Sequence, residues 1–138
     1  MKKTFHLEIL ASKRPFFKGE CEELIFPAID GECGILADHE PMVSAIQSGE
    51  LRFCSDGKWT YAAVSEGLIE ITSQYVIILA DTVEYPEEID KNRAEEAKLR
   101  AEEQLRQKQS IREYYRTQAA LNRAINRLKI SQRHINKH

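Results

Sequence analysis

Hydrophobic and polar residues alternate along the first 85 residues of this chain. The stretch "FHLEIL" places Phe5, Leu7 and Ile9 on one side of an extended chain, and "ELRFCSDGKWTYAAV" contains two alternating runs around Asp56-Gly57. A period of two is typical of strands with one buried face, and an Asp-Gly pair favours a tight hairpin turn. Because turn signals recur at intervals of roughly 8–12 residues and no helical period is present, the pattern predicts a small antiparallel β-sandwich or flattened barrel.

Beyond Pro86 the hydrophobic period changes to 3.6, and neither glycine nor proline occurs again. A proline followed by Glu87, Glu88 and Asp90 is typical of a helix N-terminus, because proline fits the first turn and carboxylates favour the positive end of the helix dipole. We therefore predict a helix over about 87–107. Its apolar stripe is narrow and mostly alanine: Ala94, Ala97, Ala101 and Leu105.

A second periodic run predicts a helix over about 111–134, and Ser110 and Glu113 have the capping-box spacing that begins a helix. Every residue between the two runs also tolerates a helix interior, so one continuous helix of about 70 Å remains an alternative to a hairpin. We predict an α+β fold, with the antiparallel β-sandwich at 1–85 followed by a two-helix hairpin at 86–138. The second run is heptad-like: Ile111, Tyr114, Gln118, Leu121, Ile125, Leu128, Gln132 and Ile135.

Charge is distributed unevenly between these two halves. The 138 residues have a formal net charge of −2, but residues 1–86 hold 7 Lys/Arg against 14 Asp/Glu, whereas residues 87–138 hold 13 against 8. Residues 109–138 contain 7 basic residues and the single acid Glu113. The C-terminal end therefore suits an acidic partner.

Arginines form a stripe on the predicted second helix, opposite its leucines and isoleucines, and Arg93 and Arg100 share a stripe on the first. Arginine binds carboxylates and phosphates well, because its planar fork donates two parallel hydrogen bonds. The stripe is either a site for an anion or acidic partner, or a solvated basic face. Its members on the second helix are Arg112, Arg116, Arg123 and Arg127.

Several function classes are excluded by what the sequence lacks. No apolar run approaches the roughly 18 residues that cross a bilayer, and the N-terminal segment does not have the form of a signal peptide. No common catalytic motif is present, and the adjacent Asp38, His39 and Glu40 rarely converge on one metal ion. The three unevenly spaced cysteines fit reduced structural thiols. We therefore expect a cytoplasmic protein that is not an independent enzyme and holds no metal.

Three motifs in order resemble one family, the epsilon subunit of the rotary F-type ATP synthase. "GECGILADHEP" (31–41) is similar to the family's G-x-x-G-I-L-x-x-H-x-P loop, and "VSEGLIEITSQYVIILADTVE" (64–84) is similar to its V-x-G-G-x-x-E-V run. "EIDKNRAEEA" (88–97) is similar to its I/L-D-x-x-R-A motif. Glu66 departs from the first glycine of the usual pair. Ala37-Asp38 replace a common Pro-Gly, a change that removes a flexible glycine from the loop.

The resemblance implies a non-catalytic rotor subunit of a proton- or sodium-translocating synthase, at the cytoplasmic face of the bacterial membrane. Its β-sandwich would bind the gamma subunit and the membrane ring of c subunits, with Glu32 at a position that faces the ring. The helices would move between a folded hairpin and an extended form that enters the catalytic alpha/beta head and suppresses ATP hydrolysis. The expected acidic partner of the basic second helix is the C-terminal domain of the beta subunits.

The resemblance also implies regulatory ATP, with magnesium only as a companion of the nucleotide. In some bacterial members of the family ATP binds the folded hairpin, and this chain carries the expected residue type at every matching position. A cluster of ordinary interhelical ion pairs is the alternative for these residues. The expected ATP-binding residues are Glu84, Ile89, Asp90, Arg93, Ala94, Arg100, Arg123 and Arg127.

Two other functions remain as alternatives. A nucleic-acid-binding module would use the basic helix, but the sandwich is acidic and only Tyr114 and Tyr115 lie near the arginine stripe for stacking. A passive rotor adaptor would have the same fold without nucleotide regulation or a moving tail. We expect no nucleic-acid partner and no direct membrane insertion.

Overall fold

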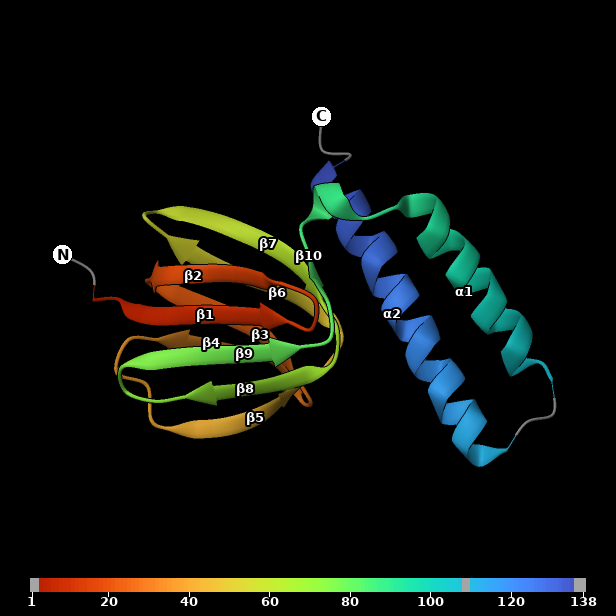
Figure 1. Ribbon diagram of the computed structural model, residues 1–138, viewed down its shortest axis with the longest axis horizontal. Coiled ribbons are helices and arrows are strands. Elements are labelled where there is room, and N and C mark those ends of the chain that lie inside the picture. Colours follow the sequence, from red (N-terminus) through yellow and green to blue (C-terminus); the bar gives the residue numbers. More distant parts are fainter. Residues whose placement is uncertain (1–2, 108–109, 136–138) are drawn as a thin grey trace. The chain divides into compact units, whose positions relative to one another are not determined.

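A computed structural model of the chain describes residues 3–107 and 110–135 (Figure 1). The chain divides into two compact units, Met1–Glu84 and Tyr85–His138. We call them the sandwich unit and the helical unit. In the part of the chain that is described, neither helix combines the length and apolar character that a membrane span requires.

Ten strands of the sandwich unit form two five-stranded sheets, as the alternating pattern predicts. In sheet 1 the order is β2-β1-β9-β8-β5, and in sheet 2 it is β10-β7-β6-β3-β4. The strands are β1 (Phe5–Ala11), β2 (Pro15–Cys21), β3 (Glu23–Ala28), β4 (Gly31–Leu36), β5 (Met42–Ile46), β6 (Gly49–Ser55), β7 (Lys58–Val64), β8 (Gly67–Ile71), β9 (Tyr75–Ala80) and β10 (Val83–Glu84).

One strand pair departs from the predicted antiparallel pattern: β1 and β9 run parallel, with Leu7 beside Val76 and Ile9 beside Ile78. The other edge of β1 pairs with β2 in an antiparallel hairpin. Because β9 comes from a remote part of the chain, no short turn imposes an antiparallel direction on its pairing with β1. The sandwich is therefore antiparallel except at this central pair.

The core of the sandwich lies between the inner faces of its two sheets. Alternate residues of each strand point inward, and Leu7, Leu24, Phe26 and Phe53 are almost completely buried. Full burial of a side chain of this size contributes about 1.5–3 kcal/mol to folding. The other large side chains in the core are Ile9, Ile35, Ile46, Leu51, Ile69, Ile71 and Ile78.

In the sandwich unit, two turns contain residues with positive φ, and one strand position requires glycine. Asp56 and Gly57 both have positive φ, 52° and 75°, which is the turn that the Asp-Gly pair predicts between β6 and β7. Asp38 also has positive φ, 65°, so the aspartate that replaces a glycine keeps a conformation that glycine adopts without strain. At Gly67 a Cβ would lie 2.1 Å from the carbonyl oxygen of Leu79, so this position requires glycine.

In the helical unit, the first helix starts later than predicted. A 3₁₀ turn, η1, spans Pro86–Glu88, and the α-helix α1 spans Lys91–Leu105 rather than beginning at Glu87. Ile89 and Asp90 between them are extended, with ψ of 122° and 101°. The side chain of Asp90 accepts a hydrogen bond from the backbone N–H of Arg93 at 3.1 Å, and this cap sets the start of α1.

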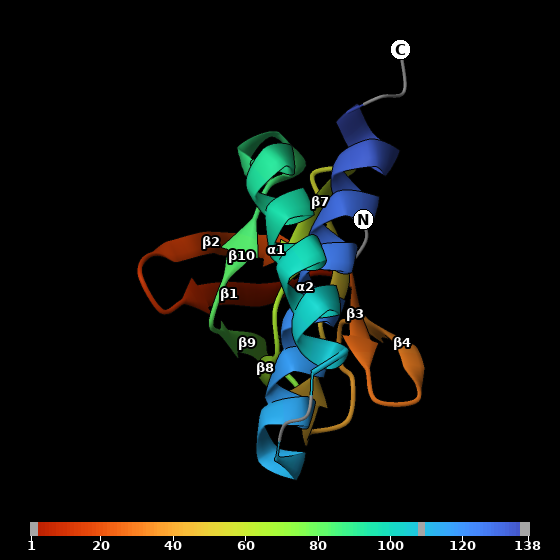
Figure 2. The same ribbon diagram turned by 90° about the vertical axis from the view of Figure 1, so that its right-hand side faces the viewer.

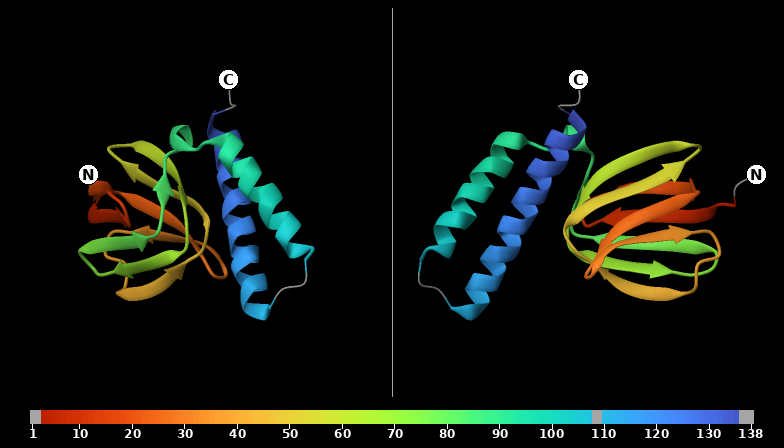
Figure 3. Two further views of the ribbon diagram at one scale, coloured as in Figure 1. Left: turned by 45° about the vertical axis from the view of Figure 1, so that its right-hand side comes forward. Right: turned by 180° about the vertical axis from the view of Figure 1, so that it is seen from behind.

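The second helix, α2, spans Ile111–Ile135, and Ser110 caps it as predicted: its Oγ accepts a hydrogen bond from the N–H of Glu113 at 3.1 Å. Figures 1 and 3 show α1 and α2 side by side and antiparallel, so the tail is a hairpin. The residues between the helices include 108–109, which lie outside the described part.

The contact between α1 and α2 uses smaller residues than the predicted heptad-like run. Ala94 and Ala101 are the buried residues of α1, and the matching buried line on α2, with the same spacing of seven, is Thr117, Ala124 and Ser131. Ile111 at the start of the predicted run is 77% exposed, and its Tyr114 is also exposed. Ile130, next to Ser131 in the sequence, is also buried, so α2 buries one large apolar side chain in addition to this line of small residues. The side chain of Ile135, the last residue of that run, lies outside the described part.

Candidate functional site

Seven of the eight expected nucleotide-binding residues lie in the helical unit. Ile89 and Ala94 are buried, Arg93 and Arg100 are exposed on α1, and the two arginines of α2 are half-buried. The start of α1 lies beside the second half of α2 (Figure 3). The first turn of α1, with Arg93 and Ala94, and the half of α2 that carries Arg123 and Arg127 therefore belong to the same end of the hairpin.

The helical geometry places the four arginines on one side of the hairpin. Arg93, Arg100 and Arg123 each directly precede a buried seam residue, Ala94, Ala101 and Ala124. In an antiparallel pair, residues that precede seam positions on the two helices face the same side. Arg127 lies three residues beyond Ala124, which at about 100° per residue also brings it to that side. This side of the seam is therefore cationic and suits an anion.

Asp90 has a structural role in this arrangement, because its carboxylate caps α1. The sequence left open whether Asp90 caps the helix or binds a ligand, and the structure shows the cap.

Within the seam, the hydroxyl of Ser131 is buried and has no hydrogen-bond partner among the described residues.

Glu84, the eighth expected residue, ends β10 of the sandwich unit. It pairs with Ala63 of β7 and is half-buried. Through this register it lies on the outer face of sheet 2, the face that also carries Glu50, since Glu50 pairs with Ala63 from the other side.

Glu32, the expected rotor-ring residue, lies on β4 at the edge of sheet 2 and forms an ion pair with Arg52 of β6. One guanidinium nitrogen, Nη2, donates to Glu32 Oε1 at 3.2 Å, and Nη1 contacts Oε2. Nη1 also lies 3.4 Å from Oε1 of Glu50. The hydrogen bonding that Arg52 donates to Glu32 is the main reason that the pKa of Arg52 lies above its ordinary value, so the guanidinium stays charged. Sequence reasoning missed Arg52 and Glu50.

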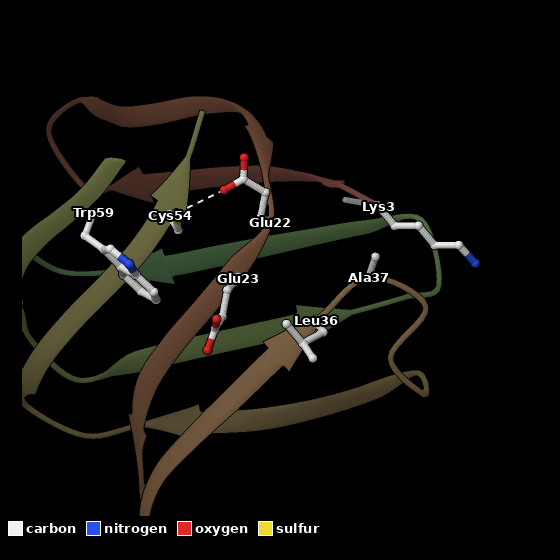
Figure 4. A pocket seen from close by; sticks show the side chains of 7 residues that line it. All are labelled: Lys3, Glu22, Glu23, Leu36, Ala37, Cys54 and Trp59. Carbon is white, nitrogen blue, oxygen red and sulfur yellow. Dashed lines mark hydrogen bonds between the residues drawn. The ribbon is translucent and has the colours of Figure 1, made fainter. Parts of the chain in front are cut away.

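A pocket of about 340 Å³ lies on the same outer face of sheet 2 (Figure 4). Four of its residues form one cross-strand row, because Glu23 pairs with both Leu36 and Cys54, and Cys54 pairs with Trp59. Figure 4 shows Trp59 and Leu36 on either side of Glu23. The described residues include no group of three or more His, Cys, Asp or Glu side chains that could hold a metal ion.

The three cysteines are free thiols. Burial, helped by the nearby Glu22, Cys54 and Glu20, raises the pKa of Cys21 to about 12. Cys54 donates a hydrogen bond to Glu22 Oε2 at 3.0 Å. A protonated, buried thiol is a poor nucleophile, so Cys21 is a core residue.

His39 forms part of a surface loop, and its Nδ1 lies 2.8 Å from the carbonyl oxygen of Glu40. The neighbouring Asp38 pairs with Lys3 at 3.0 Å. The side chains of Asp38 and His39 thus have separate contacts, Asp38 with Lys3 and His39 with the backbone of Glu40.

Sheet 1 carries an apolar row on its outer face that the sequence reading did not single out. Leu68 of β8 pairs with Ala45 on one side and with Leu79 on the other, and Leu79 pairs with Leu10 of β1. Leu68 and Leu79 are both exposed, as is Val43 on β5. The alternating pattern contained this signal, because Leu68 and Leu79 are apolar at outward positions, which are normally polar in an amphipathic strand. A row of exposed leucines marks a surface for a protein partner.

The β-sandwich model of the ATP synthase Delta/Epsilon chain matches residues 4–86, and the long α-helix model of the same chain matches residues 87–132. The chain belongs to this family. The ATP synthase epsilon chain of Ruminiclostridium cellulolyticum is 53% identical over 94% of this chain and 97% of its own length. The epsilon chain of Caldicellulosiruptor saccharolyticus is 52% identical over 91% and 92%. The resemblance to epsilon subunits stated from the motifs is therefore confirmed.

Solved structures share the fold at low sequence identity. A chain of the Euglena gracilis mitochondrial ATP synthase, solved as OSCP/F1/c-ring, matches with a TM-score of 0.74 at 21% identity, over 86% of this chain and 76% of that chain. A chain of the Tetrahymena thermophila ATP synthase central stalk/c-ring matches with a TM-score of 0.71 at 9% identity, over 94% and 98%. These two chains therefore share the fold of this chain.

Proposed function

We propose that this protein is a non-catalytic central-stalk subunit of an F-type ATP synthase, and that its helical hairpin regulates ATP hydrolysis. Membership of the epsilon family and the fold shared with chains of central-stalk and c-ring assemblies support the rotor role. In this proposal the subunit is peripheral, at the cytoplasmic face of a bacterial membrane, and couples rotation to ATP synthesis in a complex that translocates protons or sodium ions.

The sandwich unit is the platform that binds the rotor. We assign the gamma subunit to the outer face of sheet 1, where Leu68 and Leu79 form an exposed apolar row between neighbouring strands. Glu32, exposed at the edge of sheet 2, contacts the ring of c subunits. These two surfaces lie on different sheets, so both partners bind at once.

The helical unit is the switch. The buried residues of its two helices are small (alanine, threonine and serine) apart from Ile130, so the hairpin buries less apolar area than the sandwich and separating the helices costs less than disrupting the sandwich. When extended, the helices enter the alpha/beta head, where the basic α2 meets the acidic C-terminal domain of beta and suppresses hydrolysis.

ATP holds the hairpin closed in this account. The observation that supports it is the set of four arginines on one side of the seam, two from each helix, which suits a triphosphate. Magnesium reaches the site only with the phosphates. A ligand that binds only the hairpin stabilises it by about 2.7 kcal/mol at one hundred times Kd.

Titration calorimetry of the full chain with ATP, with and without magnesium, tests this proposal. We expect saturable binding that weakens by about tenfold or more in Arg123→Ala and in Arg127→Ala, because each loses a charge-assisted hydrogen bond to phosphate. Arg112→Ala is the matched control, since it removes an exposed arginine of the same helix. No saturable binding, or equal weakening in the control, contradicts the nucleotide site and favours the passive adaptor.

The two helix caps give a second control. Asp90→Ala and Ser110→Ala each remove one N-cap of the helical unit, which costs about 1 kcal/mol of helix stability. Only Asp90 lies at the end of the hairpin with the arginines, so Asp90→Ala weakens ATP binding more than Ser110→Ala. Equal effects of the two variants would show that capping alone, not the site, accounts for the loss.

A further inference from the structure

The ion pair between Glu32 and Arg52 has two hydrogen bonds and reaches across the intervening strand β3. Arg52 pairs with Ile25 of β3 in the sheet register, and Glu32 pairs with Pro27, two positions along the same strand. The guanidinium therefore crosses β3 diagonally to reach the carboxylate. Both nitrogens of its fork engage both carboxylate oxygens, which fixes the plane and direction of Glu32.

Burial increases from Glu32 toward the interior of this cluster. The Glu32 side chain is 54% exposed, Arg52 is 26% exposed, and Glu50 is only 9% exposed. Glu50 holds the inner edge of the guanidinium, and Arg52 in turn holds Glu32. Glu32, the exposed residue of this cluster, is thus held in place by Arg52, and Arg52 is held in turn by Glu50.

Stability alone is a weak explanation for this arrangement. An ion pair with one half-exposed partner contributes about 0–1 kcal/mol. Two carboxylates around one guanidinium also leave a net negative charge on the surface. A fold that needed only stability at this position would gain as much from an uncharged pair.

The surroundings of Glu32 leave room for a partner. β4 is an edge strand, and Figure 2 shows it in a hairpin with β3. A Cβ at Gly34, the next outward position, would meet no atom within 4 Å. Gly34 thus leaves an open strip of β4 beside Glu32. Exposed Leu36 and Ile29 flank this strip, so the carboxylate lies in a flat surface with apolar edges.

We propose that Arg52 is a positioning residue, which holds the carboxylate of Glu32 in place for a cationic side chain on a polar loop of the rotor ring. This inference rests on the proposed contact between Glu32 and the ring. A basic loop is the occupant that fits the net negative charge of the cluster, while Ile29 and Leu36 accept its apolar neighbours. Arg52 itself remains outside the contact and acts through Glu32.

Arg52→Lys is the most direct test, because it keeps the charge and loses the fork. Detergent-solubilised rotor ring from the same synthase is immobilised, and binding of the full chain is measured at low and high salt. We expect Glu32→Gln to weaken binding about tenfold and to reduce its salt dependence. Arg52→Lys weakens binding about threefold, mainly through faster dissociation, since a lysine orients only one oxygen.

A double-mutant cycle separates positioning from a general structural role. If Arg52 acts through Glu32, then Arg52→Lys has no further effect in the Glu32→Gln background. Glu20→Gln, which removes an exposed acid from sheet 1, is the matched control and leaves binding unchanged. Gly34→Ala is compatible with the fold and weakens binding by placing a methyl group in the open strip. Urea unfolding of each variant shows whether the sandwich remains intact.

The outcomes separate the positioning role of Arg52 from the ring contact of Glu32 on which that role depends. If the unmodified chain does not bind the ring, or if Glu32→Gln binds like the unmodified chain, the proposed ring contact is wrong. If Glu32→Gln weakens binding but Arg52→Lys does not, or if the two effects simply add, the ring contact stands and the positioning role of Arg52 is overturned.

Discussion

The two units of this chain are held together by different kinds of side chain. The sandwich buries many phenylalanine, leucine and isoleucine side chains from both sheets, whereas the two helices bury mainly small residues, Ala94, Ala101, Thr117, Ala124 and Ser131, together with Ile130. Each large core side chain contributes about 1.5–3 kcal/mol, and an alanine methyl contributes about 0.8 kcal/mol. In addition, the buried hydroxyl of Ser131 has no partner among the described residues, which costs about 1–3 kcal/mol.

This difference predicts that the two units differ in stability. The sandwich has the larger apolar core, so we expect it to be the more stable unit. The helical unit leaves Leu99, Ile111 and Tyr115 exposed, and the large apolar side chains that it buries among the described residues are Ile89 and Ile130. A ligand that bridges the two helices therefore changes the stability of the helical unit more than that of the sandwich.

The largest effect is expected from Phe26→Ala in the sandwich core. Phe26 is completely buried, so the substitution destabilises the sandwich by about 3–5 kcal/mol. Leu99→Ala, on the exposed face of α1, changes stability by less than about 0.5 kcal/mol. Urea unfolding followed by the fluorescence of Trp59, the single tryptophan, reports on the sandwich unit. Similar shifts in the two variants would remove the contrast between the units.

A smaller effect is expected from the alkaline titration of Cys21, which lies in the core of the sandwich. The pKa of Cys21 is raised from 9.0 to about 12, so above pH 9 the unfolded chain loses a proton that the folded chain keeps. The stabilisation is complete below pH 9 and is lost as pH rises toward 12. Between pH 8 and 10 this thiol lowers the free energy of unfolding by about 1.4 kcal/mol.

Cys21→Ala provides the comparison for that pH dependence. Other groups titrate in the same range, so the relevant quantity is the difference between the two slopes of unfolding free energy against pH. The variant is less stable at pH 8 but loses less stability on going to pH 10. Parallel slopes would show that Cys21 does not titrate differently in the two states.

Features that depend on neighbouring residues in the sequence were predicted well. The Asp56-Gly57 turn, the cap at Ser110 and the change from strands to helices near Pro86 all follow from local backbone preferences. Three motifs also identified the family, because they cover both units in the correct order.

Features that depend on distant residues were predicted poorly. The parallel pairing of β1 with β9 joins strands from opposite ends of the sandwich, and no local signal sets its direction. The start of α1 moved to Lys91 because the Asp90 side chain caps there, while the upstream acids suit a helix start equally well. Arg52 was missed because the residue it holds lies on another strand, two positions across the sheet.

In the proposed function, nucleotide acts on the helical unit and leaves the sandwich unchanged. Amide hydrogen exchange of the full chain, with and without ATP and magnesium, tests it directly. We expect slow exchange in β1 and β9 under both conditions, and faster exchange in α1 and α2 that slows about 100-fold at one hundred times Kd. Helical amides whose exchange is unaffected by ATP, or protection that rises equally in both units, would contradict the account.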